Sequence, residues 1–169
     1  AKITLGGGLD FADTIVTVPG AFTIDIAGAF AMNGAISTTG AVVIDAGMGI
    51  LMGAPASIST TNDVITMTSG NNNINLGLLY AGAAEVSLTA TGGDILNNNG
   101  VFADITQSLT NIQAGSAALV ATSRIGVSSL NPITLDIDPN NAISLTFGAA
   151  NAYINNLQNS QIINNSQGI

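Results

Sequence analysis

Four short runs decide the fold of this chain: FTIDI at residues 22–26, VVID at 42–45, ITMT at 65–68 and VSLTA at 86–90. In each run, large apolar residues alternate with polar or small ones, which is the pattern of a strand buried on one face. The runs begin at intervals of 20 to 23 residues, and a near-constant interval is typical of stacked coils. The sequence therefore favours a parallel β-solenoid over a sandwich or a barrel, which also use short, evenly spaced strands.

The same rhythm continues on both sides of this region. Further strands are predicted at ITL 3–5, TIVTV 14–18, DIL 94–96, DITQSL 104–109, AALVA 117–121, ITLDI 133–137, AISLTF 142–147 and AYIN 152–155. Turn-forming Gly, Pro and Asn residues separate the runs, and no stretch has the apolar stripe of an amphipathic helix. We expect almost no helix and a single solenoid segment over residues 1–169, part of a longer repetitive protein. At roughly 20 residues per coil, it would have about eight coils and a length near 40 Å.

The composition excludes several kinds of function. The chain has no Cys, no His and no Trp, and Lys2 and Arg124 are its only basic residues. A net charge of −8 argues against binding nucleic acid, whose phosphates are met by clustered Lys and Arg. Absence of Cys removes disulfides, thiol catalysis and Cys-type zinc sites. The most apolar window, residues 40–56, is interrupted by Asp45, Pro55 and several glycines, so no membrane-spanning segment is expected.

Asparagine is concentrated at the ends of the predicted strands. It occurs at residues 71–73 and 75, 97–99, 140–141 and 155–156. In a stacked array, Asn side chains at equivalent corners can hydrogen-bond to the coils above and below, and Asn tolerates left-handed turn geometry. The alternative is that these residues only populate loops. Small-residue runs such as Ala27-Gly28-Ala29 would allow the coils to turn tightly.

The second half of the chain resembles a known family. The stretches VSLTATGGDI at 86–95, NIQAGSAALVATSRIG at 111–126, NPITLDI at 131–137, NAISLTF at 141–147 and NAYINN at 151–156 are similar to repeats of filamentous haemagglutinin-like exoproteins and autotransporter passengers. The resemblance covers about residues 84–156. It implies a right-handed parallel β-helix, secreted by Gram-negative bacteria and displayed at the cell surface as part of a large adhesin fibre.

Carboxylate chemistry is the strongest enzymatic alternative, because β-helices can host polysaccharide lyases and hydrolases built on Asp and Glu pairs. Asp136 and Asp138 are expected to share a face, and Asp10 and Asp13 lie close in sequence. Such lyases also need a basic residue to stabilise the developing anion, and the chain offers few. We expect no catalytic residues and interpret the acids as solubilising side chains at turns and strand ends.

Metal and ligand signals are equally sparse. The run from Gly6 to Asp10 is partly similar to the calcium-binding nonapeptide of β-rolls, but Leu9 stands where glycine is required, and the run occurs once. Pro139 breaks the calcium-loop pattern that begins at Asp136. No metal and no cofactor are therefore expected. We interpret Arg124 as half of a surface salt bridge, with an ion pair to a neighbouring chain or a glycan as the alternative.

The sequence thus predicts a structural, non-catalytic segment of a secreted bacterial adhesin or extracellular fibre. It would act as a rigid rod or spacer that associates end to end or with further coils of its parent chain, and surface glycans are a second class of partner. The alternatives are a carbohydrate-binding or polysaccharide-degrading β-helix, in which Tyr80 and Tyr153 would stack on sugars, and a phage-type fibre. An ice-binding face would need a regular Thr-x-Thr array, which only Thr66–Thr68 and Thr89–Thr91 supply.

Overall fold

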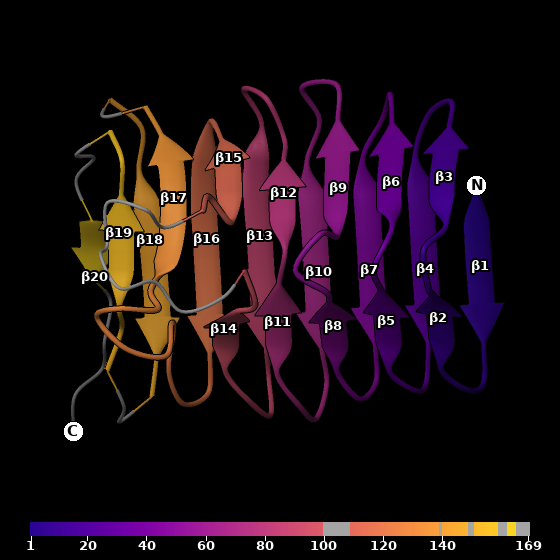
Figure 1. Ribbon diagram of the computed structural model, residues 1–169, viewed down its shortest axis with the longest axis horizontal. Coiled ribbons are helices and arrows are strands. Elements are labelled where there is room, and N and C mark those ends of the chain that lie inside the picture. The colour runs from indigo at the N-terminus through magenta and orange to yellow at the C-terminus, as the bar shows by residue number, and fades with distance from the viewer. Residues whose placement is uncertain (100–108, 139, 149–150, 159–161, 165–169) are drawn as a thin grey trace.

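The computed structural model describes residues 1–99, 109–138, 140–148, 151–158 and 162–164, and it shows a parallel β-solenoid (Figure 1). This part of the chain contains no helix, and so none that is long and apolar enough to cross a membrane. The predicted all-β solenoid is confirmed, with about seven turns instead of the expected eight. Of the predicted strand DITQSL, only Leu109 is among the described residues, and it is not in a strand.

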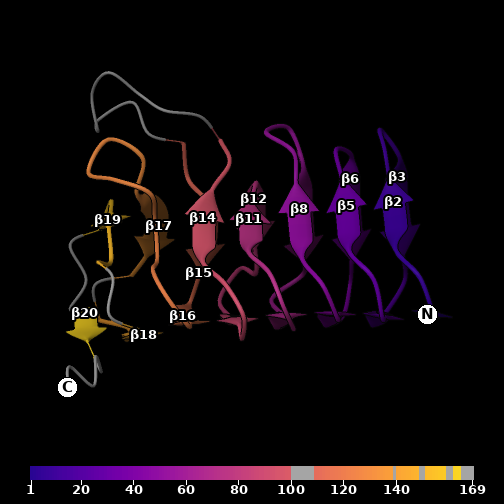
Figure 2. The ribbon, with the colours of Figure 1, turned by 90° about the horizontal axis from the view of Figure 1, so that it is seen from below.

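Each regular turn contributes one strand to each of three parallel sheets, which we call A, B and C. Sheet A contains β1 (Lys2–Leu5), β4 (Phe22–Ile26), β7 (Val42–Ala46), β10 (Ile65–Ser69), β13 (Glu85–Ala90), β16 (Ser116–Ala121), β18 (Ile143–Phe147) and β20 (Ile162–Asn164). Sheet B contains β2 (Leu9–Phe11), β5 (Phe30–Met32), β8 (Ile50–Met52), β11 (Ile74–Leu76) and β14 (Ile95–Asn97). Sheet C contains β3 (Ile15–Val18), β6 (Ala35–Thr38), β9 (Ser57–Thr60), β12 (Leu78–Tyr80), β15 (Ile112–Ala114), β17 (Ile133–Ile137) and β19 (Ile154–Asn156). The arrows of sheet A point opposite to those of sheets B and C in Figure 1, and Figure 2 shows the same coils from below, with the strands of sheet A along one side.

The register of sheet A explains the rhythm of the sequence. Ile24 pairs with Ile44, Ile44 with Met67, and Met67 with Leu88, so equivalent residues are 20, 23 and 21 positions apart. The next two steps are longer: Leu88 pairs with Leu119, 31 positions on, and Leu119 pairs with a leucine 26 positions further. These two long coils reduce the number of turns below the estimate made from a constant 20-residue repeat.

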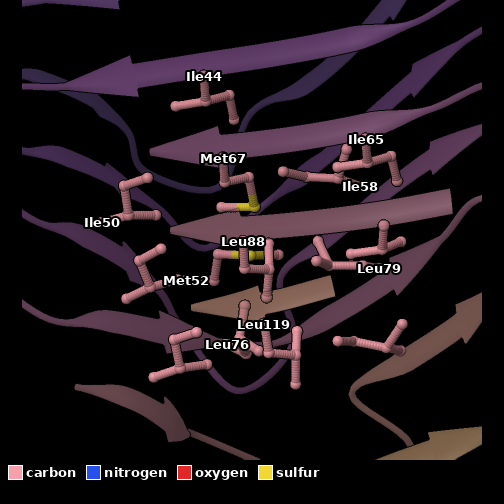
Figure 3. Packing of buried hydrophobic residues seen from close by; sticks show 14 of the residues in the cluster. Ile44, Ile50, Met52, Ile58, Ile65, Met67, Leu76, Leu79, Leu88 and Leu119 are labelled. Carbon is pink, nitrogen blue, oxygen red and sulfur yellow. The ribbon is translucent and has the colours of Figure 1, made fainter. Parts of the chain in front are cut away.

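The core is a set of apolar columns that run along the solenoid axis. In the central column of sheet A, Ile44, Met67, Leu88 and Leu119 are each fully buried, and Figure 3 shows them stacked. The columns of sheets B and C face this one from the other side of the coil. They include Phe30, Ile50, Ile74 and Ile95 in sheet B, and Ile36, Ile58, Leu79, Ile112 and Leu135 in sheet C. Since every second residue of each strand points inward, the alternation in the sequence becomes a continuous core.

Asparagine side chains connect neighbouring coils at the corners, as one of the two interpretations predicted. The partner, however, is mostly backbone instead of another Asn. Asn73 Oδ1 accepts a hydrogen bond from the Asp94 N–H at 2.9 Å, and Asn71 Nδ2 donates to the Gly47 carbonyl oxygen at 2.9 Å. Asn140 differs, because it donates to a side chain of its own turn. These bonds satisfy backbone groups at corners, where the sheet ladders are interrupted.

Asn111 makes the most extensive of these connections. It is fully buried immediately before β15, and its Nδ2 donates to Asn97 Oδ1 at 2.9 Å and to the Gly77 carbonyl oxygen at 3.2 Å. Its Oδ1 accepts from the Thr134 N–H at 3.0 Å. The side-chain amide of Asn111 therefore makes hydrogen bonds within its own coil, to the preceding coil and to the following coil.

Candidate functional site

The two basic side chains of the sequence both pair with acids of the same chain. Lys2 Nζ lies 3.3 Å from Asp25 Oδ2 on the outer face of sheet A, where both side chains are exposed. Arg124 Nε donates to Asp94 Oδ2 at 2.9 Å, and its backbone N–H donates to Asp94 Oδ1 at 3.1 Å. Arg124 is therefore half of a salt bridge between successive coils, as the sequence predicted.

A groove of about 480 Å³ lies on the outer face of sheet C and the corner that leads to sheet A. Its lining brings together polar side chains from five separate parts of the sequence, among them Tyr80, Gln113, Asp136 and Gln158. Pockets that bind small ligands have volumes of roughly 300 to 1,000 Å³, so the groove is large enough for one. Most of its lining is polar, and we treat it as the candidate functional site.

The register of sheet C places three of these side chains in one row. Tyr80 at the end of β12 pairs with Gln113 in β15, and Gln113 pairs with Asp136 in β17 (strands labelled in Figure 1). Each lies one position from a buried core residue, so all three point outward. Neighbouring strands are about 4.8 Å apart, and the row therefore advances by that step along the solenoid axis. Ser59, which pairs with Tyr80 on the other side, leaves the tyrosine with a small neighbour.

The groove is hollow at the corner because small residues form that part of its lining. Gly82, Ala83, Ala114 and Gly115 lie there, between the row of longer side chains on sheet C and sheet A. Coils approach closely at this corner: a Cβ added to Gly115 would lie 2.0 Å from the Ala83 carbonyl oxygen. A larger side chain at Gly115 would displace the neighbouring coil.

The electrostatic character of the groove is acidic. Asp136 is half-buried and Asp138 is exposed, and both line it, so the two aspartates share a face as the sequence predicted. Gln158 Nε2 donates to Asp136 Oδ1 at 2.9 Å, which fixes the orientation of that carboxylate. Asp138 Oδ1 accepts from the backbone N–H and from the side-chain amide of Asn140, at 2.8 and 2.9 Å. Neither Lys2 nor Arg124 lines the groove.

The sequence identified parts of this site but not the whole. Tyr80 was considered as an aromatic that stacks on sugars, and Asp136 as half of a carboxylate pair, but nothing in the sequence placed them together. Gln113 and Gln158 were missed. Only the pairing of the strands brings them into the site: Gln113 becomes a neighbour of Tyr80 because β12 and β15 pair across a coil of 33 residues.

Two other hollows lie on different faces. One of about 390 Å³ is on sheet B and is mainly apolar, with Met48 and Leu51 exposed at 46% and 48%. The other, of about 260 Å³, is lined by Tyr153 together with Ser129 and Pro132. Tyr153 therefore does not join Tyr80, and its hydroxyl accepts a hydrogen bond from Asn151 Nδ2 at 3.2 Å.

The remaining candidates from the sequence lie elsewhere on the solenoid. In sheet A, Thr66 and Thr68 stack on Ser87 and Thr89, whereas Thr91 begins a turn, so the two Thr-x-Thr pairs of the sequence do not form a regular array. Asp10 lies in β2, and Asp13 lies in the turn that follows it. The described residues contain no group of three or more His, Cys, Asp or Glu side chains that could hold a metal ion.

Comparisons with known proteins return no match to this chain among family models, curated proteins or solved structures. The parallel β-solenoid that the family resemblance implied is present. The resemblance of residues 84–156 to filamentous haemagglutinin-like repeats stays a prediction from sequence, because no family match supports it.

Proposed function

We propose that this chain is a structural, non-catalytic segment of a secreted bacterial surface adhesin or extracellular fibre. The observation that carries the proposal is the continuous in-register stacking of about seven turns around one apolar core. At about 4.8 Å per turn, seven turns give a rod of roughly 35 Å. Each added coil lengthens such a rod without changing its cross-section, which is the property that a spacer needs.

The surface chemistry supports an extracellular location for the rod. Only 7% of the residues are charged, against about 25% in an ordinary domain, and the outer face of sheet A carries neutral side chains such as Thr66, Thr68 and Ser87. The resemblance of residues 84–156 to exoprotein repeats points in the same direction. A non-catalytic role is supported by the groove on sheet C, whose two aspartates have no basic residue beside them.

Self-association is proposed through the edge formed by β1, β2 and β3, the outermost strands of the three sheets. A strand at the edge of a sheet leaves N–H and C=O groups open to pairing with another strand. The core-facing side chains of this coil are also less covered than their partners in the next coil: Leu5 is 41% exposed, and Ile3 and Val16 are only partly buried, whereas Ile26, Ile24 and Ile36 are buried. A further coil of a longer parent chain, or a second copy of this chain, would cover them.

Electron microscopy of the purified chain at low and high concentration tests this proposal. We expect short rods at low concentration and longer rods of the same width at high concentration. Leu5→Lys should shorten the rods, because it places a charge on the apolar edge. Leu51→Lys is the matched control, since Leu51 is 48% exposed on the side of the solenoid. Compact dispersed particles at both concentrations would contradict self-stacking, and equal shortening by both variants would contradict the proposed edge.

The cellular location needs a separate test. On intact cells that produce the natural protein, an antibody raised against this segment should label the surface. Labelling that appears only after the cells are permeabilised would contradict the proposed location.

A further inference from the structure

The groove on sheet C has the chemistry of a carbohydrate site, and we propose that it binds a neutral hexose oligosaccharide along the solenoid axis. This inference goes beyond the structural role, and it does not depend on self-association. It rests on the row formed by Tyr80, Gln113 and Asp136 and on the small residues beside that row.

Tyr80 supplies the surface on which a sugar ring stacks. Its side chain is 41% exposed, and no hydrogen bond within the described residues engages its hydroxyl. A pyranose presents C–H groups on one face, and an exposed aromatic ring covers such a face while its own polar tip stays in water. The neighbouring Ser59 is small and leaves access to the ring from that side.

Gln113 and Asp136 supply hydrogen bonds to hydroxyl groups. The Gln113 side chain is exposed, and within the described residues its amide makes no hydrogen bond, so both a donor and an acceptor face the groove. Among the described residues, Asp136 accepts a hydrogen bond from Gln158 through Oδ1, and none of them donates to Oδ2, which can therefore accept from a ligand. A carboxylate held in place in this way accepts sugar hydroxyls without first having to be ordered.

The geometry of the row fits an oligomer better than a single sugar. Side chains in the row repeat about every 4.8 Å, a step similar to the width of a pyranose ring. An oligosaccharide lying along the axis would therefore place successive rings against Tyr80, Gln113 and Asp136. The groove is open and about 480 Å³ in volume, which indicates a shallow site for part of a longer chain.

The charge of the groove selects against anionic sugars. Asp136 and Asp138 both line it, the chain carries a net charge of −8, and both basic residues are paired elsewhere. Uronates and sulfated glycans would place like charges beside these carboxylates, which weakens binding. Neutral hexoses can donate hydroxyl hydrogen bonds to the same carboxylates without repulsion between like charges.

Amide NMR titration of the dispersed chain tests the proposal, with cellohexaose, maltohexaose and mannohexaose as neutral probes and with heparin and oligogalacturonate as anionic ones. We expect at least one neutral hexaose to shift amide resonances of β12, β15 and β17 and to bind more tightly than either anionic probe. Tyr80→Ala should weaken that binding about tenfold, the loss expected when an aromatic contact is removed. Leu51→Ala is the control, because it truncates a similarly exposed side chain on sheet B.

Three results would overturn the inference: no neutral hexaose binds at millimolar concentration, an anionic probe binds more tightly, or the groove variants bind as the unmodified chain does. Gln113→Ala and Asp136→Asn repeat the test if Tyr80→Ala does not fold. Because binding is measured on the dispersed chain, a failure to form long rods leaves this test intact. Release of reducing ends from a bound hexaose would contradict the non-catalytic role and leave the binding site standing.

Discussion

Asn111 offers the sharpest test of how the coils are held together at their corners. Its side chain is fully buried and makes hydrogen bonds of 2.9 Å to Asn97 Oδ1 and 3.0 Å from the Thr134 N–H, with a longer one to Gly77. A typical internal hydrogen bond contributes about 0.5 to 1.5 kcal/mol net, and an emptied buried site adds a cavity cost. We therefore expect Asn111→Ala to lower the free energy of unfolding by about 2 to 4 kcal/mol.

Asn111→Asp separates hydrogen bonding from packing, because the two side chains have nearly the same shape. The introduced carboxyl keeps an acceptor for the Thr134 N–H but turns a second oxygen toward the Gly77 carbonyl and Asn97 Oδ1, which are themselves acceptors. Burial and these oxygens favour the neutral acid, so its pKa in the folded chain rises above the unfolded value of about 4. An acid with a raised folded pKa destabilises the fold as pH rises between the two values. The free energy of unfolding therefore falls by about 1.4 kcal/mol per pH unit between the unfolded and the folded pKa, and it does not fall further above the folded pKa.

Urea denaturation followed by circular dichroism at several pH values between 3.5 and 7.5 measures both effects. Asn75→Asp is the matched control, since Asn75 points outward from β11 and its carboxyl variant would remain in contact with water. The reasoning is refuted if Asn111→Asp has the same pH dependence as this control. It is also refuted if Asn111→Ala costs less than about 1 kcal/mol, because the lost hydrogen bonds alone exceed that value.

Two further predictions concern packing between coils. Leu88→Ala should lower the free energy of unfolding in urea by about 2 to 5 kcal/mol, because Leu88 is fully buried between Met67 and its partner in β16. Thr89→Ala, on the outer face of the same strand, should change it by less than about 0.5 kcal/mol. Equal costs would contradict the assignment of inner and outer faces. Gly77→Ala should be about 1 to 3 kcal/mol less stable than Gly6→Ala. A Cβ added at Gly77 would lie 2.3 Å from a carbonyl oxygen of the preceding coil, whereas a Cβ added at Gly6 would have no atom within 4 Å. Both changes reduce the entropy of the unfolded chain alike, so a thermal melt that shows no difference between them would contradict the close approach of the coils.

The sequence predicted sheet A far better than sheets B and C. FTIDI, VSLTA and AISLTF were placed at the residues where β4, β13 and β18 lie, because their alternation extends over five or six residues. Strands β5 and β8 were missed. They have three residues each, too few for a period of two to be recognised, and they form because β4 and β7 already hold successive coils in register.

The candidate site was less predictable because it depends on which residues the coils bring side by side. A shift of one residue in the pairing of β12 with β15 would turn Gln113 away from Tyr80 and into the core. No property of Gln113 in the sequence indicates its register. The same is true of Gln158, which reaches Asp136 from the next coil, 22 residues further on.

The groove lies where the repeat is least regular, and this connects the proposed rod to the proposed sugar site. Between Ile24 and Leu88 the coils are 20 to 23 residues long, and in the two coils before Tyr80 the same row of sheet C carries only the serines Ser37 and Ser59. The two long coils that follow supply Gln113 and Asp136 to that row. Residues added to a solenoid coil enter its loops and leave the stacked strands in place, so a binding site can be built there at little cost to the core. Regular coils would then set the length of the rod, and the irregular ones would hold its ligand.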